Sequence, residues 1–286
     1  MGKRRDASAA ETSNSGGKGS RPITRKHLET GFAELGLKAG ARVMVHSSLS
    51  SFGRVEGGPD AVIDALKAIV GERGTVVMPS FNHGAPFEPG GPGVYDPLVT
   101  PTSNGAIPDR FWRLPGTFRS LNPTHAFAAW GSDAEEIVRA HHTGTTMGPA
   151  SPLDQLWRAD GSVLLLGVGF TANTFHHVVE HSVGAPCLGE RSEQYPVRMP
   201  DGSVEMVATW GWRDGKCPIT DSDRYGPILI ASGTVRQTTI GSSRCLLFSM
   251  RDCHAVVSRL LEHGLPPHPP CSRCPIRPRR VKWTVR

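Results

Sequence analysis

The chain has 286 residues, 38% of them hydrophobic and 20% charged, which is enough apolar material for one large domain or two small ones. The formal net charge is +6, but the first 22 residues carry a net +3 and the last 16 carry a net +6, so the body between them is mildly acidic at −3. A membrane span and a secretory signal are excluded, because the sequence has neither an apolar run of about 18 residues nor an apolar leader, and we expect a cytoplasmic protein.

The first predicted elements form a strand–helix–strand unit. Residues 1–21 are rich in Gly, Ser and charge, and we expect a disordered basic tail there. A folded domain is expected over 22–270. It contains a strand at Arg42–Ser47, a helix that starts near Pro59 and a strand at Thr75–Met78. This order predicts two parallel strands joined by a right-handed crossover.

The middle of the chain alternates loops, helices and strands. Residues 82–102 are rich in Gly and Pro and predict a long functional loop. The elements expected next are a short helix at 109–113, a strand at 127–130, a helix at 133–142, and a further helix capped by Ser151 with Pro152 at its first position.

A strand at Val163–Val168 is followed by a helix that Asn173 or Thr174 is expected to cap. After it, Val197–Asp201 and Glu205–Trp210 predict a hairpin. A strand is expected within 233–246, and an amphipathic helix over 251–263 that Gly264 ends. The pattern as a whole predicts an α/β fold, a layered sheet flanked by helices, with a small antiparallel excursion and a cysteine-tethered C-terminal tail.

Two histidines and a glutamate share the helix after that strand. His176 lies four residues and His177 three residues before Glu180, so either imidazole can meet the carboxylate on one helix face. The first helical turns disfavour a positively charged ring. A neutral imidazole oriented by a carboxylate near a strand end is a candidate general base. The alternative is a helix that carries surface histidines.

Six cysteines occur without a signal peptide, so a disulfide scaffold is not expected. Cys271 and Cys274 form a C-x₂-C knuckle that suits zinc, and the alternative is two free thiols in the tail. The arginines of 271–286 beside Trp283 would suit a nucleic acid, although a solvated tail is the simpler interpretation.

Several motifs occur in an order that resembles a known enzyme family. HSSL at 46–49, SPL at 151–153, LLGVG at 165–169 and NTxxHxxE at 173–180 resemble the aminoglycoside 3-N-acetyltransferases, over residues 22 to 274. The resemblance implies an antibiotic N-acetyltransferase fold rather than the GNAT fold. It also implies acetyl-CoA as co-substrate, an aminoglycoside antibiotic as acceptor at its 3-amino group, a role in resistance, and a possible homodimer.

The same resemblance implies the roles of particular residues. An ammonium has no lone pair, so transfer from a thioester needs a base that frees the amine. His177 occupies the base position, Glu180 would orient it or hold the substrate ammonium, and Asp221 or Asp223 would supply a second carboxylate. His176 stands where the family pattern is usually apolar.

The loop Ser47, Ser48 and Leu49 is implied to bind coenzyme A. The C-terminal knuckle resembles one branch of the family, which implies a zinc site tethering the tail. Its ligands would be Cys217, Cys271 and Cys274, with His268 or Cys187 as the fourth.

Some positions depart from the family pattern and leave the acceptor open. Asn122 stands where His is frequent, and Ala126 where Ser is frequent. One alternative is therefore a related acyl-CoA-dependent N-acyltransferase of natural-product biosynthesis that acts on another amine. A second alternative is a zinc-knuckle protein that binds nucleic acid through residues 271–286, although neither nucleic acid nor a membrane is the expected partner.

Overall fold

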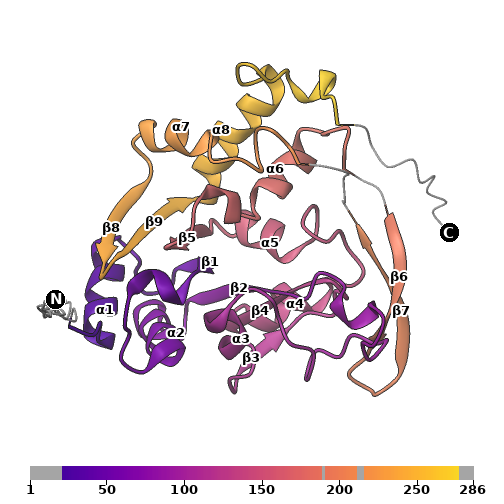
Figure 1. Ribbon diagram of the computed structural model, residues 1–286, viewed down its shortest axis with the longest axis horizontal. Helices are drawn as coiled ribbons and strands as arrows, with labels where there is room; N and C mark the ends of the chain where they lie inside the picture. The colour runs from indigo at the N-terminus through magenta and orange to yellow at the C-terminus, as the bar shows by residue number, and fades with distance from the viewer. Residues whose placement is uncertain (1–20, 189–190, 211–215, 277–286) are drawn as a thin grey trace, which may run out of the picture.

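A computed structural model describes residues 21–188, 191–210 and 216–276, and its centre is a mixed seven-stranded sheet (Figure 1). Parallel strands occupy the middle of the sheet, and antiparallel strands complete both sides. The predicted tail 1–21 lies outside the described residues except for Arg21, as does the basic end from 277 onward. In spatial order the strands are β3 (Thr117–Arg119), β4 (His125–Gly131), β2 (Thr75–Phe81), β1 (Arg42–Ser47), β5 (Ser162–Leu166), β9 (Ser243–Ser249) and β8 (Arg236–Ile240).

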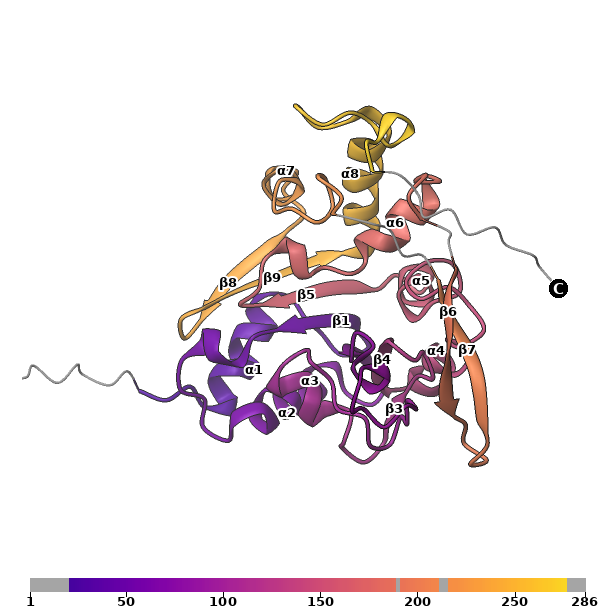
Figure 2. The ribbon, with the colours of Figure 1, turned by 45° about the vertical axis from the view of Figure 1, so that its right-hand side comes forward.

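Helices cover both faces of this sheet (Figure 2). One face packs against α1 (Arg25–Glu34), α2 (Gly58–Val70) and α3 (Ala106–Phe111). The other face packs against α4 (Ala134–Arg139), α5 (Pro152–Arg158), α6 (His176–Ser182), α7 (Tyr225–Ala231) and α8 (Met250–His263). The predicted α/β class, a layered sheet flanked by helices, is confirmed.

The central strands are apolar on both sides because both faces are covered. In β5, Leu164 and Leu166 join the core beneath α2, whereas Val163 and Leu165 join the core beneath α6 and α8. All four side chains are fully buried. Burial of each contributes about 1.5–3 kcal/mol, so β5 is a rigid base for the loop that follows it.

The first strand–helix–strand unit forms as predicted. β1 and β2 pair in parallel, with Val43 opposite Val76, and α2 connects them. The backbone of Gly57 is left-handed, with φ 79°, immediately before the helix, and a proline lies in the first turn. Glycine adopts this conformation without strain, so the loop can turn sharply into α2.

A hairpin forms as the two-stranded sheet of β6 (Arg191–Arg198) and β7 (Val204–Trp210). The predicted first strand, Val197–Asp201, is wrong in its bounds, because β6 ends at Arg198 and Asp201 lies in the turn. The hairpin packs on the long loop 82–102 through Tyr95. The Tyr95 backbone N–H donates to Pro196 O at 2.9 Å, and Arg198 N–H donates to Tyr95 O at 2.8 Å. The loop is therefore ordered by the hairpin.

The structure adds elements that the sequence pattern did not indicate. Helices α1 and α7 and strand β3 were not expected, and the single strand expected at 233–246 is the pair β8 and β9. A 3₁₀ turn at Cys271–Arg273 packs against α8, so the described part of the tail is attached to the domain. Within the described ranges no helix has the length and apolar character needed to cross a bilayer.

Candidate active site

The candidate site lies where β1 and β5 end, at the edge of the sheet where parallel strands gather ligands. Its first contact joins β1 to the residue just before α6. The backbone N–H and the hydroxyl of Thr174, just before α6, both lie 3.4 Å from Nε2 of His46 in β1. The start of α6 is thereby fixed against the end of β1.

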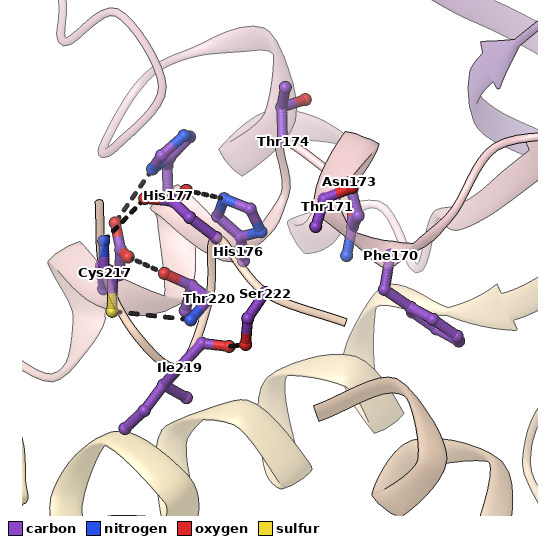
Figure 3. A network of polar contacts seen from close by, with 12 residues as sticks. Phe170, Thr171, Asn173, Thr174, His176, His177, Cys217, Ile219, Thr220 and Ser222 are labelled. Atoms are coloured by element: carbon purple, nitrogen blue, oxygen red, sulfur yellow. Dashed lines mark hydrogen bonds and ion pairs between the residues drawn. The ribbon is translucent and has the colours of Figure 1, made fainter. Parts of the chain in front are cut away.

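His177 and Glu180 form a hydrogen-bonded pair on α6 (Figure 3). Nδ1 of His177 lies 2.9 Å from one carboxylate oxygen of Glu180, and the hydroxyl of Thr220 donates to the other. Glu180 is 1% exposed, whereas the His177 side chain is 23% exposed. A buried carboxylate needs such donors to offset its lost hydration. The pair therefore holds the imidazole ring in one orientation while leaving it accessible from outside.

Asp221 lies beside the neighbouring histidine. Nε2 of His176 is 3.5 Å from Oδ1 of Asp221, and the backbone N–H of Cys217 donates to Oδ2 at 2.8 Å. Burial, together with the charge of His177, lowers the pKa of His176, and Asp221 partly offsets that effect. Of the two predicted carboxylates, Asp221 is the one next to the histidine pair.

Asp223 has a different environment. It is exposed, and its Oδ1 accepts a hydrogen bond from the backbone N–H of Thr171 at 3.3 Å. This contact holds the short turn at Phe170–Ala172 that leads from β5 towards α6. The structure thus places Asp223 against this turn.

The predicted cap of α6 is wrong. The helix begins at His176, and Phe175 before it has no capping side chain. Asn173 instead accepts a hydrogen bond from Phe175 N–H at 3.2 Å, two residues on, and donates to the Tyr225 hydroxyl at 3.1 Å. An Asx turn of this kind competes with capping, and here it delays the helix.

Two buried histidines, His46 and His125, and the exposed His83 near this edge were missed as site residues. Burial, aided by His176, lowers the pKa of His46 to about 3. Burial and the neighbours His83, His177 and His141 hold the pKa of His125 well below its ordinary value. His83 Nδ1 lies 3.1 Å from His125 Nε2. These residues are far apart in sequence. The one feature of the sequence that could have indicated them is a polar residue at the end of a predicted strand.

The loop predicted to bind coenzyme A lines a hollow of about 470 Å³. Ser47, Ser48 and Leu49 face it together with Asn104 and Gly105, next to α3. The hydroxyl of Ser47 is buried and has no hydrogen-bond partner among the described residues. A larger hollow of about 950 Å³ beside β3 is lined by none of the predicted site residues.

Of the predicted metal ligands, Cys187, Cys217 and Cys274 lie near Cys271 of the C-terminal turn. Burial and the neighbouring Cys217, Cys274 and Cys187 raise the pKa of Cys271 to about 12. The His268 ring is hydrogen-bonded to the Arg224 guanidinium. The structure therefore groups four cysteines.

Comparison with known proteins places these features in context. Residues 44–262 match the family model of the aminoglycoside 3-N-acetyltransferases. The SPbeta prophage-derived aminoglycoside N(3')-acetyltransferase-like protein YokD of Bacillus subtilis (strain 168) is 37% identical over 258 residues, which cover 81% of this chain and 89% of that protein.

Two solved structures are also similar. A mutant of the aminoglycoside acetyltransferase AAC(3)-IVa in complex with a gentamicin has a TM-score of 0.72 and 31% identity, covering 85% of this chain and 89% of that one. The binary complex of AAC-IIIb with CoASH has a TM-score of 0.73 and 29% identity, covering 85% of this chain and 97% of that one.

Proposed function

The chain belongs to the aminoglycoside 3-N-acetyltransferase family, a family of acyltransferases, and we propose that it transfers the acetyl group of acetyl-CoA to the 3-amino group of an aminoglycoside. The observation that carries this proposal is the accessible His177 ring held by the buried carboxylate of Glu180. An imidazole oriented in this way at the end of a parallel strand pair suits general-base catalysis.

The transfer proceeds without an acetylated enzyme. Nδ1 of His177 faces Glu180, so Nε2 is the nitrogen that accepts the proton of the substrate amine. The freed amine attacks the thioester carbonyl, the tetrahedral intermediate collapses, and the carbon–sulfur bond breaks. The coenzyme A thiolate leaves and takes up the second proton that the nitrogen loses, which gives an amide and a thiol, and His177 releases the first proton to solvent. Glu180 stabilises the imidazolium that exists in between.

Asp221 binds a positively charged amine of the sugar in this proposal. It lies beside the histidine pair and is about a quarter exposed, so it can meet a ligand. The folded body is mildly acidic, which favours a polycation. Asp223 acts indirectly, by holding the turn before α6 through Thr171.

Ser47, Ser48 and Leu49 hold the coenzyme in this proposal. The support is the hollow that they line and the unpartnered hydroxyl of Ser47, which a polar group of the coenzyme would satisfy. The glycine-flanked start of α2 follows this loop, and its backbone amides suit a phosphate.

We also propose a structural zinc at the C-terminal turn. Cys271 lies among three other cysteines. Thiolates that are buried next to one another repel, and a bound zinc ion removes this repulsion because thiolate sulfur is a good zinc ligand. Cys187, Cys217, Cys271 and Cys274 would complete a closed four-ligand site. The zinc would pin the turn at Cys271–Arg273 to the domain. Cys187 is preferred to His268, because the His268 ring is engaged by Arg224.

Zinc content measured on the purified chain tests this site. We expect one zinc per chain, lost in Cys274→Ser and Cys187→Ser and kept in His268→Asn and in the control Cys245→Ala, whose thiol is in the core. Zinc retained by Cys274→Ser would refute the site.

Acetylation of a panel of amines tests the activity. Acetyl-CoA consumption should depend on an aminoglycoside with a deoxystreptamine ring, and NMR of the product should show the acetyl group on the 3-nitrogen. Indifference to every aminoglycoside, with turnover on another amine, would favour the biosynthetic alternative. A cytoplasmic location and a homodimer stay predictions.

A further inference from the structure

Two histidines, one of which is the proposed base, converge with an aspartate in the candidate site. The donor atoms of His176, His177 and Asp221 all lie within 4.8 Å of one another. The two imidazole rings meet edge to face with centroids 4.4 Å apart, and His176 Nε2 is 3.5 Å from Asp221 Oδ1. Figure 3 shows the two histidines next to each other, beside the segment that carries Cys217 and Thr220. The cluster therefore joins α6 to a second stretch of chain.

The donor set has a recognisable chemistry. Two imidazoles and one carboxylate on one side of an ion, with open positions left for water or substrate, suit divalent first-row transition ions. With bonds of about 2.0–2.2 Å, neighbouring donors around such an ion lie about 3–3.5 Å apart. His176 Nε2 and Asp221 Oδ1 already have that separation, so only the ring of His177 has to move closer to complete the site.

The surroundings of the cluster are also those of a metal site. A histidine that binds a metal usually donates its other ring N–H to a carboxylate, a backbone carbonyl or water, and this hydrogen bond fixes the ring. His177 has this arrangement, because its Nδ1 faces the buried Glu180. Asp221 is fixed in turn by the backbone N–H of Cys217 at 2.8 Å.

His176 supplies a second observation. Its side chain is 2% exposed, and Nε2 is the ring nitrogen that faces Asp221 Oδ1, at 3.5 Å. No step of the proposed acetyl transfer uses this residue, so the transfer chemistry gives no reason for a histidine there.

We propose that His176, His177 and Asp221 bind a divalent first-row transition ion, such as Zn²⁺, Co²⁺ or Ni²⁺, and that the bound ion reversibly blocks acetyl transfer. The ion takes the lone pair of His177 that would otherwise accept the amine proton. The inhibition rests on the proposed function, whereas the binding does not. The site is distinct from the four-cysteine cluster, since it offers nitrogen and oxygen donors.

The direct test is calorimetric titration of the full-length protein with NiCl₂, after loosely bound metal is removed by a chelating resin. Wild-type protein should bind one Ni²⁺ per chain, and Ni²⁺ should inhibit turnover over the same concentration range, with recovery on adding EDTA. His176→Asn should weaken binding and inhibition at least about tenfold while keeping its basal turnover. His263→Asn, at the exposed end of α8, is the matched control and should behave as wild type.

A second measurement needs no variant. Diethylpyrocarbonate modification of the peptide that carries His176 and His177, followed by mass spectrometry, should fall when Ni²⁺ is bound. No saturable binding up to about 1 mM, a weak limit, would overturn the site, as would binding unchanged in His176→Asn with no protection of this peptide. Binding at the site that leaves turnover intact would overturn the inhibition and the assignment of His177 as base.

Discussion

Replacing Glu180 by Gln tests the proposed orientation of His177. The substitution keeps the shape of the side chain but removes the negative charge that faces Nδ1 at 2.9 Å. Glu180 is buried, so water does not substitute for the lost carboxylate. A hydrogen bond to a buried charged group contributes about 1.5–3 kcal/mol. At about 1.36 kcal/mol per factor of ten, kcat/KM for the aminoglycoside should fall about 10- to 150-fold.

The assay is steady-state release of coenzyme A, followed with a thiol reagent at saturating acetyl-CoA. The KM for acetyl-CoA should not change. The proposed coenzyme loop follows His46 on β1, whereas Glu180 is on α6, and the hollow that the loop lines does not include Glu180. Glu136→Gln, an exposed glutamate on α4, is the control and should have wild-type kinetics. A Glu180→Gln enzyme within about twofold of wild type would refute the reasoning, since the lost interaction would then not act in the transition state.

Three further outcomes follow from the structure. Ser48→Tyr places a bulky ring in the hollow of about 470 Å³. It should raise the KM for acetyl-CoA by about tenfold or more and leave that of the aminoglycoside unchanged. An unchanged KM for acetyl-CoA would contradict the placement of the coenzyme. Asn173→Ala should lower the free energy of unfolding in urea by about 1–3 kcal/mol, because buried Phe175 N–H and the Tyr225 hydroxyl lose a partner, and an unchanged urea midpoint would count against that role. Burial lowers the pKa of His141 from 6.5 to about 4. Below pH 6.5 the unfolded chain therefore takes up a proton that the folded chain does not, and the free energy of unfolding decreases as the pH is lowered. Between pH 7.5 and 5 this one group should cost about 2 kcal/mol, and His141→Gln should show a correspondingly smaller loss over the same range.

Regular hydrophobic patterns predicted the frame of the fold. The apolar runs of β1, β2 and β5 and the stripe of α2 give the central parallel strands directly, because both faces of those strands are buried. Strand β3 has three residues, and Phe118 within it is 41% exposed, so it carries too little pattern to be found. Its existence depends on pairing with β4, which is a tertiary contact.

The candidate site was predictable where its residues are neighbours in sequence. The spacing of His177 and Glu180 on one helix gives their contact, and that contact is observed. The choice of Asp221 over Asp223 was not predictable, because it depends on how the segment from Cys217 onward folds back against α6. The location of His46 and His125 near the site likewise comes from sheet topology, which brings the end of β1 and the start of β4 to one edge of the sheet.

The most direct test of the account is the turnover of His177→Ala with saturating acetyl-CoA and an aminoglycoside that the wild-type enzyme acetylates. Removal of a general base should lower kcat about 10²- to 10⁴-fold, and added imidazole should restore part of the loss. Turnover near the wild-type level would contradict the central claim that this imidazole takes the proton from the sugar amine.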